Sequence, residues 1–350
     1  MRLSVARLRI GAQQIARHDF RRPKDVVAWL GAVQAQDYAG AKWALGARLP
    51  DGVTDASIER ALDQGEMLRT HAMRWTWQLV APEDVRWIVE LVAPRLMQKA
   101  ARRHRELELD AKTIAQSNAA IGKALAEAPL TRAELAAVLR RARVAPDGQR
   151  LPHLLACAEL ACIATSGPRR GKQHTWTLLD ERAPRARRVD PRDAAAELAF
   201  RWARSRGPAT ADDFAWWSGL PSSVAREALQ ANAHRLASET LDGRTLWFDA
   251  KARAGDATCL LPAFDELLVG YRVRDDLLDP SLAKRINAGG GMLAASILAG
   301  DRIVGTWRRE LAGARVVVAH SLDARVGRDE LARATRRYAA FLERAYDEAR

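Results

Sequence analysis

Two glutamines and an aspartate stand close together in the segment Gln34-Ala35-Gln36-Asp37, between two stretches of helical pattern. An amide side chain has one acceptor oxygen and two N–H donors, so a glutamine pair can position a water molecule without being ionised. Amides two residues apart diverge on a helix but share a face on an extended backbone. The segment is therefore a candidate site if it is extended. The alternative is that both amides only solvate a helix end.

Most other enzymatic signatures are absent from the sequence. It contains no phosphate-binding G-x-x-x-x-G-K-[ST] loop, no G-x-S-x-G elbow and no H-E-x-x-H motif. The cysteines at positions 157, 162 and 259 form no C-x-x-C pair, and no histidine cluster has zinc spacing. We therefore expect no metal site, no cofactor and no disulfide framework.

The elements around the glutamine segment are expected to be short helices followed by an extended stretch. Residues 23–34, 38–49 and 57–64 have helical patterns, and Pro23 stands where a first turn favours proline. Residues 67–80 alternate between apolar and polar positions, which is typical of a strand.

Two capping boxes begin similar units further along the chain. Thr131 is followed by Glu134, and Thr210 by Asp213, so each threonine can cap a first turn while the acid reaches back. Each box opens a helix that is followed by a turn, a second helix and a β-hairpin. The hairpin strands are expected at residues 163–166, 175–178, 236–241 and 245–248. This order is the winged-helix plan, and the N-terminal part is compatible with a third copy.

The loop of the first of these hairpins, residues 167–174, is rich in glycine and basic residues. A basic hairpin tip suits contact with phosphates, and the alternative is a solvated loop. The candidate DNA-binding residues in this loop are Arg169, Arg170, Lys172, Gln173 and His174.

The last ninety residues change character, with strand patterns near 296–298, 303–307 and 315–319 and a helix expected over 328–350. We predict a mainly α fold with β-hairpins (α+β), made of tandem winged-helix domains plus a small C-terminal β-barrel. The expected parts are an N-terminal winged helix, a helical connector, a second and a third winged helix, and the barrel with its final helix. Their boundaries are 1–94, 95–128, 129–190, 191–255 and 256–350.

The composition favours a polyanionic partner. The 350 residues carry 56 Lys+Arg against 43 Asp+Glu, a net charge of +13, and the pI is about 10.3. This balance points first to nucleic acid, although an arginine- and alanine-rich chain can also reflect a GC-rich genome. The start lacks the apolar region of a signal peptide, and no run approaches the ~18 apolar residues of a membrane span. We expect a cytoplasmic, nucleoid-associated protein without membrane contact.

Five blocks in order resemble the AlkZ-like (AlkZ/YcaQ) winged-helix DNA glycosylases. The first is Val33-Gln34-Ala35-Gln36-Asp37, which is similar to the family's Gln-x-Gln motif. The others lie at residues 69–87, 207–220, 261–272 and 304–308. The family's fold is a set of tandem winged helices plus a small β-barrel. Some members carry Asp at the second motif position, so Gln36 makes this chain similar to the branch that removes bulky alkylated purines and can unhook crosslinks.

The resemblance implies roles for individual residues. Gln34 and Gln36 would hold the attacking water, while Asp37 caps the loop or stabilises the cationic sugar. Supporting roles are implied for His71, Arg74 and Gln78, and DNA contact for Arg74, the 167–174 loop and Arg272. Relatives often have Gly or Pro where this chain has Trp75, and His where it has Gln78. A bulky Trp75 would alter the wall of the lesion-facing surface, and the lost imidazole removes one proton carrier.

The predicted function is therefore a metal-free, monofunctional glycosylase that excises cationic alkylated purines from double-stranded DNA. No obvious Schiff-base lysine stands beside the motif, so lyase activity is not expected. The alternatives are a DNA-binding regulator without chemistry and an RNA-binding or nucleoid-associated protein. Regulators of this type usually have one winged helix and a dimerisation element, whereas tandem copies in one chain favour a monomer around one duplex.

Overall fold

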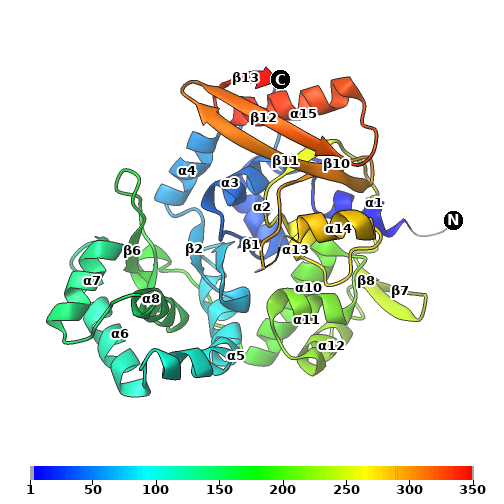
Figure 1. Cartoon of the computed structure of the whole chain (residues 1–350). Helices are drawn as coiled ribbons and strands as arrows, with labels where there is room; N and C mark the ends of the chain where they lie inside the picture. The colour runs from blue at the N-terminus through cyan, green and yellow to red at the C-terminus, as the bar shows by residue number, and fades with distance from the viewer. Residues whose placement is uncertain (1–3, 288, 290, 349–350) are drawn as a thin grey trace.

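The computed structural model describes residues 4–287, 289 and 291–348. Within these residues the helices and strands form three helix–sheet units and a C-terminal sheet (Figure 1). In that view the second unit lies on the left, the third unit lies at the lower right, and the strands of the first unit lie between them. The C-terminal sheet lies across the top. In the described part of the chain no helix has the length and apolar character needed to cross a membrane.

The first unit contains the Gln-x-Gln segment on a three-stranded antiparallel sheet of order β1-β3-β2. Its helices are α1 (Val5–Ala12), α2 (Pro23–Leu30), α3 (Tyr38–Gly46) and α4 (Asp55–Asp63). Its strands are β1 (Val33–Gln34), β2 (Leu68–His71) and β3 (Trp77–Val80).

Two expectations for this unit are wrong in their boundaries. The helix expected over 23–34 ends at Leu30, because Gly31 has a positive φ of 76°, a conformation that favours glycine. Gln34 therefore belongs to a strand. The single strand expected over 67–80 is a hairpin, because a 3₁₀ turn at Met73–Trp75 separates β2 from β3.

The second unit begins with two long helices, α5 (Val85–Glu106) and α6 (Ala111–Leu125), and the expected boundary at residue 94 lies inside α5. The capping box at Thr131 is confirmed, since its side chain accepts from the Glu134 amide and the Glu134 side chain from the Thr131 amide. The other elements are β4 (Leu130–Thr131), α7 (Arg132–Arg141), α8 (Arg150–Leu160), β5 (Ala164–Ser166), β6 (Thr175–Leu178) and α9 (Leu179–Arg182).

The third unit repeats this arrangement. Its capping box at Thr210 and Asp213 is confirmed, and its hairpin turns at Asp242 and Gly243, which both have positive φ as a tight two-residue turn requires. Its elements are α10 (Pro191–Arg206), α11 (Ala211–Ser218), α12 (Ser222–Gln230), β7 (Ala237–Leu241) and β8 (Arg244–Phe248).

The C-terminal part is a five-stranded sheet of order β13-β12-β11-β10-β9, which curls into half a barrel. Its strands are β9 (Cys259–Leu261), β10 (Ser296–Ala299), β11 (Arg302–Ala312), β12 (Arg315–Leu322) and β13 (Ala345–Glu348). Its helices are α13 (Glu266–Val269), α14 (Pro280–Ile286) and α15 (Arg328–Phe341). The helix expected over 328–350 is thus too long: it ends at Phe341 and β13 pairs in parallel with β12, while residues 349–350 lie outside the described chain.

Two hydrophobic clusters hold these parts together. The larger one joins the first unit, the N-terminal half of α5, α10–α12 and the C-terminal sheet, and Tyr271 (0% exposed) and Trp307 (8%) belong to it. The smaller cluster lies within the second unit, between Leu109 and Trp176. The first unit therefore shares its core with the C-terminal half and with the first helix of the unit that follows it.

Candidate active site

Gln34 lies on β1 directly opposite Gln78 on β3, so both side chains lie on one face of the small sheet. Both are buried, with exposed fractions of 8% and 1%. Gln78 Nε2 donates to Thr76 Oγ1 at 2.8 Å. Gln34 Oε1 is sealed from solvent and has no hydrogen-bond partner among the described residues. A buried acceptor of this kind is costly unless a ligand or a water satisfies it.

Gln36 and Asp37 follow on a bend and are exposed. The backbone is extended up to Ala35, whose N–H donates to the carbonyl of Trp77 at 2.8 Å. Asp37 is the N-cap of α3 and accepts from the Gly40 amide at 3.1 Å. The motif therefore presents one buried and one exposed glutamine, and its aspartate is engaged as a cap.

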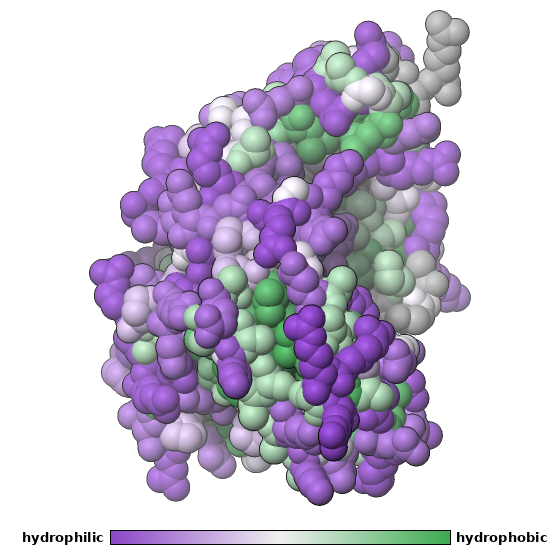
Figure 2. All heavy atoms as spheres, turned by 90° about the vertical axis from the view of Figure 1, so that its left-hand side faces the viewer, coloured by the Kyte–Doolittle hydropathy of each residue, from purple (hydrophilic) through white to green (hydrophobic). Residues whose placement is uncertain are grey.

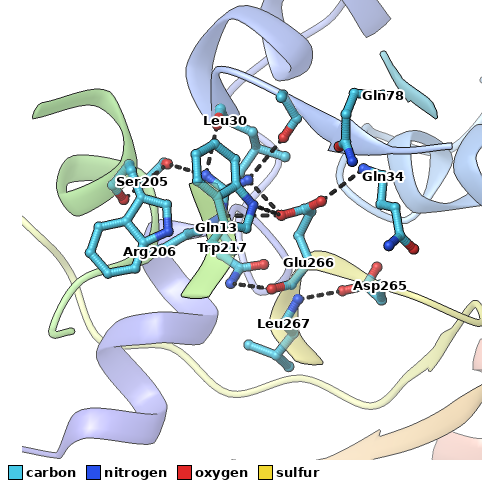
Figure 3. A network of polar contacts seen from close by, with 12 residues as sticks. Gln13, Leu30, Gln34, Gln78, Ser205, Arg206, Trp217, Asp265, Glu266 and Leu267 are labelled. Atoms are coloured by element: carbon cyan, nitrogen blue, oxygen red, sulfur yellow. Dashed lines mark hydrogen bonds and ion pairs between the residues drawn. The ribbon is translucent and has the colours of Figure 1, made fainter. Parts of the chain in front are cut away.

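Glu266, at the start of α13, holds the motif strand from behind. Glu266 is 1% exposed. Its carboxylate accepts hydrogen bonds from the backbone N–H of Gln34 at 2.8 Å, from Trp217 Nε1 at 3.0 Å and from Arg206 Nη2 at 2.6 Å. Figure 3 shows this network with Gln34 and Gln78 beside Glu266. The carboxylate joins the first unit, the third unit and the C-terminal part at one point.

Arg206, the last residue of α10, completes the support. It is fully buried and donates to the carbonyls of Leu30 (2.7 Å) and Ala32 (2.9 Å), on either side of the Gly31 turn. The Arg206–Glu266 ion pair therefore fixes the backbone from Leu30 to Gln34 through three hydrogen bonds. A guanidinium can do this because it offers five donors in a rigid plane.

A second buried pair lies directly behind the first. Arg48 and Asp265 are both fully buried, and the two nitrogens Nη1 and Nη2 reach the two carboxylate oxygens at 2.8 Å each. Gln13 donates to the Glu266 carbonyl at 3.2 Å and to the Tyr271 hydroxyl at 2.9 Å. These contacts set the position of Glu266 before any ligand arrives.

His71 lies at the end of β2 and contacts the second unit. Its Nδ1 is 2.7 Å from Glu159 Oε2, and Glu159 also accepts from Trp176 Nε1 at 2.6 Å. Burial disfavours the charge on Glu159, but His71 and Trp176 outweigh that cost and lower the pKa of its carboxyl. The structure thus places His71 at the contact between two units, where its ring is oriented by a buried carboxylate.

Arg74 and Trp75 form the turn between β2 and β3, and both have the left-handed φ values (58° and 63°) that non-glycine residues seldom adopt. Arg74 lies 5.9 Å over the ring of the exposed Trp216, and burial lowers the pKa of its guanidinium. Trp75 packs between His104 (5.6 Å between ring centroids) and His153 (5.5 Å). Trp75 therefore fills the space between α5 and α8, and it remains half-buried.

The 167–174 loop folds back onto the first unit. Arg169 donates through Nη1 to Glu59 at 3.1 Å, and the ring of His174 meets the edge of Tyr38 at 4.6 Å. Arg170 donates to Glu134 at 2.7 Å and is exposed, as are Lys172 and Gln173. The structure therefore separates the candidate DNA-binding residues of this loop into an outward group and an inward group.

Arg272 lies elsewhere. Its amide donates to Asp213 Oδ1 at 2.8 Å, and its guanidinium is 4.0 Å from Asp212. It lines a cleft of about 1200 Å³ between α11, α12 and the β7–β8 hairpin, and none of the Gln-x-Gln residues lines that cleft. Gln34, His71 and Gln78 thus lie on the small sheet and Gln36 and Asp37 directly follow it, whereas Arg272 lies on a different surface.

Sequence reasoning did not assign a role to several residues that hold the site. Glu266 and Arg69 stand within blocks that carry the family resemblance, whereas Arg206 and Glu159 lie in amphipathic helices where charged residues are ordinarily solvated. Arg206 and Glu159 could have been found as charged residues that stand on the apolar face of their helices, where a charge needs a buried partner. Within the described ranges, no group of three or more His, Cys, Asp or Glu side chains is arranged to hold a metal ion.

Comparisons with known proteins agree with this arrangement. Residues 27–341 match the family model described as DNA glycosylase AlkZ-like. The structure is similar to that of Streptomyces sahachiroi DNA glycosylase AlkZ, with a TM-score of 0.80, 19% identity and 100% of each chain covered. No curated protein matches the chain. The structural likeness establishes the shared fold, and because the family match extends over most of the sequence, the chain belongs to the AlkZ-like DNA glycosylase family.

Proposed function

We propose that this DNA repair glycosylase excises cationic, N7- or N3-alkylated purines by hydrolysis of the N-glycosidic bond, with Gln34 and Gln36 holding the attacking water. The observation that carries the proposal is the buried, unpartnered Oε1 of Gln34 beside Gln78. That oxygen is an acceptor fixed in place before substrate binds. A water that donates to it gains a defined orientation without any charged side chain.

Amides suffice for this reaction because the leaving group is activated already. Alkylation at N7 or N3 makes the purine cationic, so the base departs without protonation by a strong acid. The enzyme then needs to orient water under C1′ and to tolerate positive charge on the sugar. Positioning and preorganised dipoles supply this kind of rate enhancement. Glu266 contributes indirectly, since it fixes the Gln34 backbone from the side away from solvent.

We infer that the three helix–sheet units are winged helices that bind one DNA duplex as a monomer. Each has helices followed by a two- or three-stranded antiparallel sheet, which is the order of that motif. The lesioned nucleotide would leave the base stack to reach the small sheet, as in other enzymes that act on bases. The positive charge of the chain would favour the encounter with DNA in the cytoplasmic nucleoid.

We also infer that the enzyme is monofunctional and metal-independent. The lysine nearest to the motif in sequence, Lys42, is 5% exposed and donates to Asp55 and Glu59 at 2.7 Å each. An ammonium group held by two carboxylates is a poor nucleophile, because a Schiff base needs the free amine. Hydrolysis would therefore leave an intact abasic site, and cleavage of the strand would require added alkali.

The test is incubation with duplex DNA that carries an N7-alkylguanine, or a nitrogen-mustard crosslink, followed by alkali. We expect strand cleavage at the lesion and at least a 100-fold slower single-turnover rate for Gln34→Ala and Gln36→Ala, because loss of positioning costs roughly that much. DNA affinity should stay unchanged, since neither amide neutralises a phosphate.

The control is untreated duplex of the same sequence, which should give no cleavage with or without alkali. Absence of an abasic product from every cationic lesion would contradict the proposal and leave a DNA-binding protein without chemistry. Equal loss of binding and rate in the two variants would instead mean that the amides only contact DNA.

A further inference from the structure

Arg69, on β2, is a buried cation without an anionic partner. Its exposed fraction is 9%, and Glu159, the carboxylate whose charge acts on it, is bonded to His71 and Trp176 instead. Burial lowers the pKa of its guanidinium to about 10. An unpaired buried charge is expensive, so its retention points to a ligand that supplies the missing anion.

The guanidinium is held in one orientation. Its Nε donates to the Ala35 carbonyl at 3.0 Å, and its plane lies over the ring of Trp77 at 4.0 Å from the centroid. The ring centroid of Tyr38, the first residue of α3, lies 5.7 Å from the Arg69 guanidinium carbon. The remaining nitrogens, Nη1 and Nη2, have no hydrogen-bond partner in the described chain and are not sealed from solvent.

This orientation places the free nitrogens next to the Gln-x-Gln motif. Ala35 stands between Gln34 and Gln36, so the residue that binds Arg69 is the middle residue of the motif. A guanidinium with one edge fixed and the other open matches the two oxygens of a phosphodiester. A duplex has such a group on either side of every nucleotide.

We propose that Arg69 binds the phosphate of the lesion strand next to the excised nucleotide and so sets which nucleotide faces the two glutamines. The inference rests on the proposed function and names the group of the substrate that this arginine recognises. It differs from the basic 167–174 loop, where Arg169 already has Glu59 as its anionic partner. Arg69 would instead gain its partner when DNA binds.

The experiment uses the full chain and duplexes with a single N7-methylguanine. The phosphate immediately 5′ or 3′ of the lesion is replaced by a neutral methylphosphonate, one at a time. Single-turnover excision and duplex affinity are measured for the wild type, Arg69→Gln and Arg69→Lys. The matched control is Arg7→Gln, an exposed arginine on α1 that is paired with Asp256.

We expect the wild type to lose about 10-fold in affinity at one of the two positions, the usual size of one charged contact. Arg69→Gln should lose the same factor on natural DNA and nothing further at that position, with a salt slope smaller by about 1. Arg69→Lys should keep the salt slope but excise more slowly, because an ammonium lacks the planar pair of donors. Arg7→Gln should behave as the wild type.

The proposal would be overturned if the affinity loss from Arg69→Gln and the loss from the methylphosphonate added up at both positions. Arg69 would then only support the Ala35 carbonyl. Thermal unfolding of each variant separates loss of folding from loss of contact, and Arg69→Lys keeps the test valid if Arg69→Gln does not fold. The duplex affinities alone measure the coupling between Arg69 and the replaced phosphate, so this test also works if the wild type excises nothing. A failure of the proposed function is therefore distinguishable from a failure of this inference.

Discussion

A single carboxylate, that of Glu266, connects the parts of the chain that hold the Gln-x-Gln strand in position. Glu266 accepts hydrogen bonds from Gln34, Arg206 and Trp217 within a site that is almost fully buried. Buried ion pairs gain little stability over apolar packing, but removal of one partner leaves an uncompensated charge. The pair is better explained by positioning, because Arg206 also donates to the carbonyls at Leu30 and Ala32.

Replacement of Glu266 by glutamine should therefore affect stability and chemistry together. We expect Glu266→Gln to lower the free energy of unfolding by about 3 kcal/mol, since Arg206 is left buried without its anion. Among molecules that stay folded, the single-turnover excision rate should fall about 10-fold or more while KM changes little, because Gln34 shifts and DNA contacts do not. Urea unfolding and single-turnover kinetics measure the two effects.

The matched control is Glu106→Gln on α5. Glu106 is 41% exposed and pairs with Arg102 and Arg103 at the surface, so its loss should leave the free energy of unfolding and the excision rate close to those of the wild type. A Glu266→Gln variant with wild-type kinetics would show that the carboxylate contributes only to folding.

The elements that local chemistry determines could be predicted from the sequence. The capping boxes at Thr131 and Thr210 and the turn at Asp242-Gly243 each rest on contacts within four residues, and all three are present. The strand β13 could not be predicted in this way, because its parallel partner β12 lies more than twenty residues away. The left-handed turn at Arg74 and Trp75 is likewise set by its packing on α5, α8 and α11.

The candidate site shows the same division. The two glutamines and Gln78 were found from their residue types and from the family resemblance, and the structure brings Gln34 and Gln78 together. The supports Glu266 and Arg206 stand more than 170 residues from the carbonyls and amide that they bind. No periodicity within one element reports contacts of this kind.

The docked 167–174 loop predicts a dependence of stability on pH. Burial, together with Arg69 and Arg169, lowers the pKa of His174 to about 4, whereas an unfolded histidine titrates near 6.5. Between these values the unfolded chain binds more protons, so stability is retained above about pH 6.5 and falls as the pH drops toward 4. In His174→Asn the acid-induced decrease in the free energy of unfolding should be smaller by on the order of 1 kcal/mol. This value is reduced because the ring is partly exposed.

Urea unfolding at pH 7.5 and 5.0 measures the difference between the two proteins. His18, His104 and His153 also have lowered pKa values, chiefly through burial, so the variant should keep part of the acid sensitivity. The exposed His234 provides the control, and His234→Asn should follow the wild type. Parallel losses in His174→Asn and the wild type would show that the loop is not docked in solution.

At the scale of the whole molecule, the two cores differ in size and in what they join. The larger cluster connects the first unit, the N-terminal half of α5, the third unit and the C-terminal sheet, whereas the smaller one lies within the second unit. Figure 2 turns the second unit toward the viewer, and most of that face is hydrophilic. The second unit joins the others through the N-terminal half of α5, which belongs to the larger cluster, and through polar contacts such as His71–Glu159 and Arg169–Glu59.

This arrangement predicts that the part of the second unit around the smaller cluster opens before the rest. In hydrogen exchange at low urea concentration, amides of α6 and α7 should exchange with a lower opening free energy than those of β3 and α10. The expected difference is on the order of 1–2 kcal/mol, because a small core buries less apolar surface. Equal opening free energies in all four elements would mean that the chain unfolds as one cooperative body.

The position of Arg206 and Glu266 has a consequence for chains assembled from two relatives. The motif strand, α10 and α13 come from three distant stretches, yet they share one set of hydrogen bonds. A chimaera that takes its N-terminal half from one glycosylase and its C-terminal half from another keeps a working motif only if the incoming half supplies a matching arginine and glutamate. Exchange of halves between family members is thus constrained by two residues that are buried behind the motif.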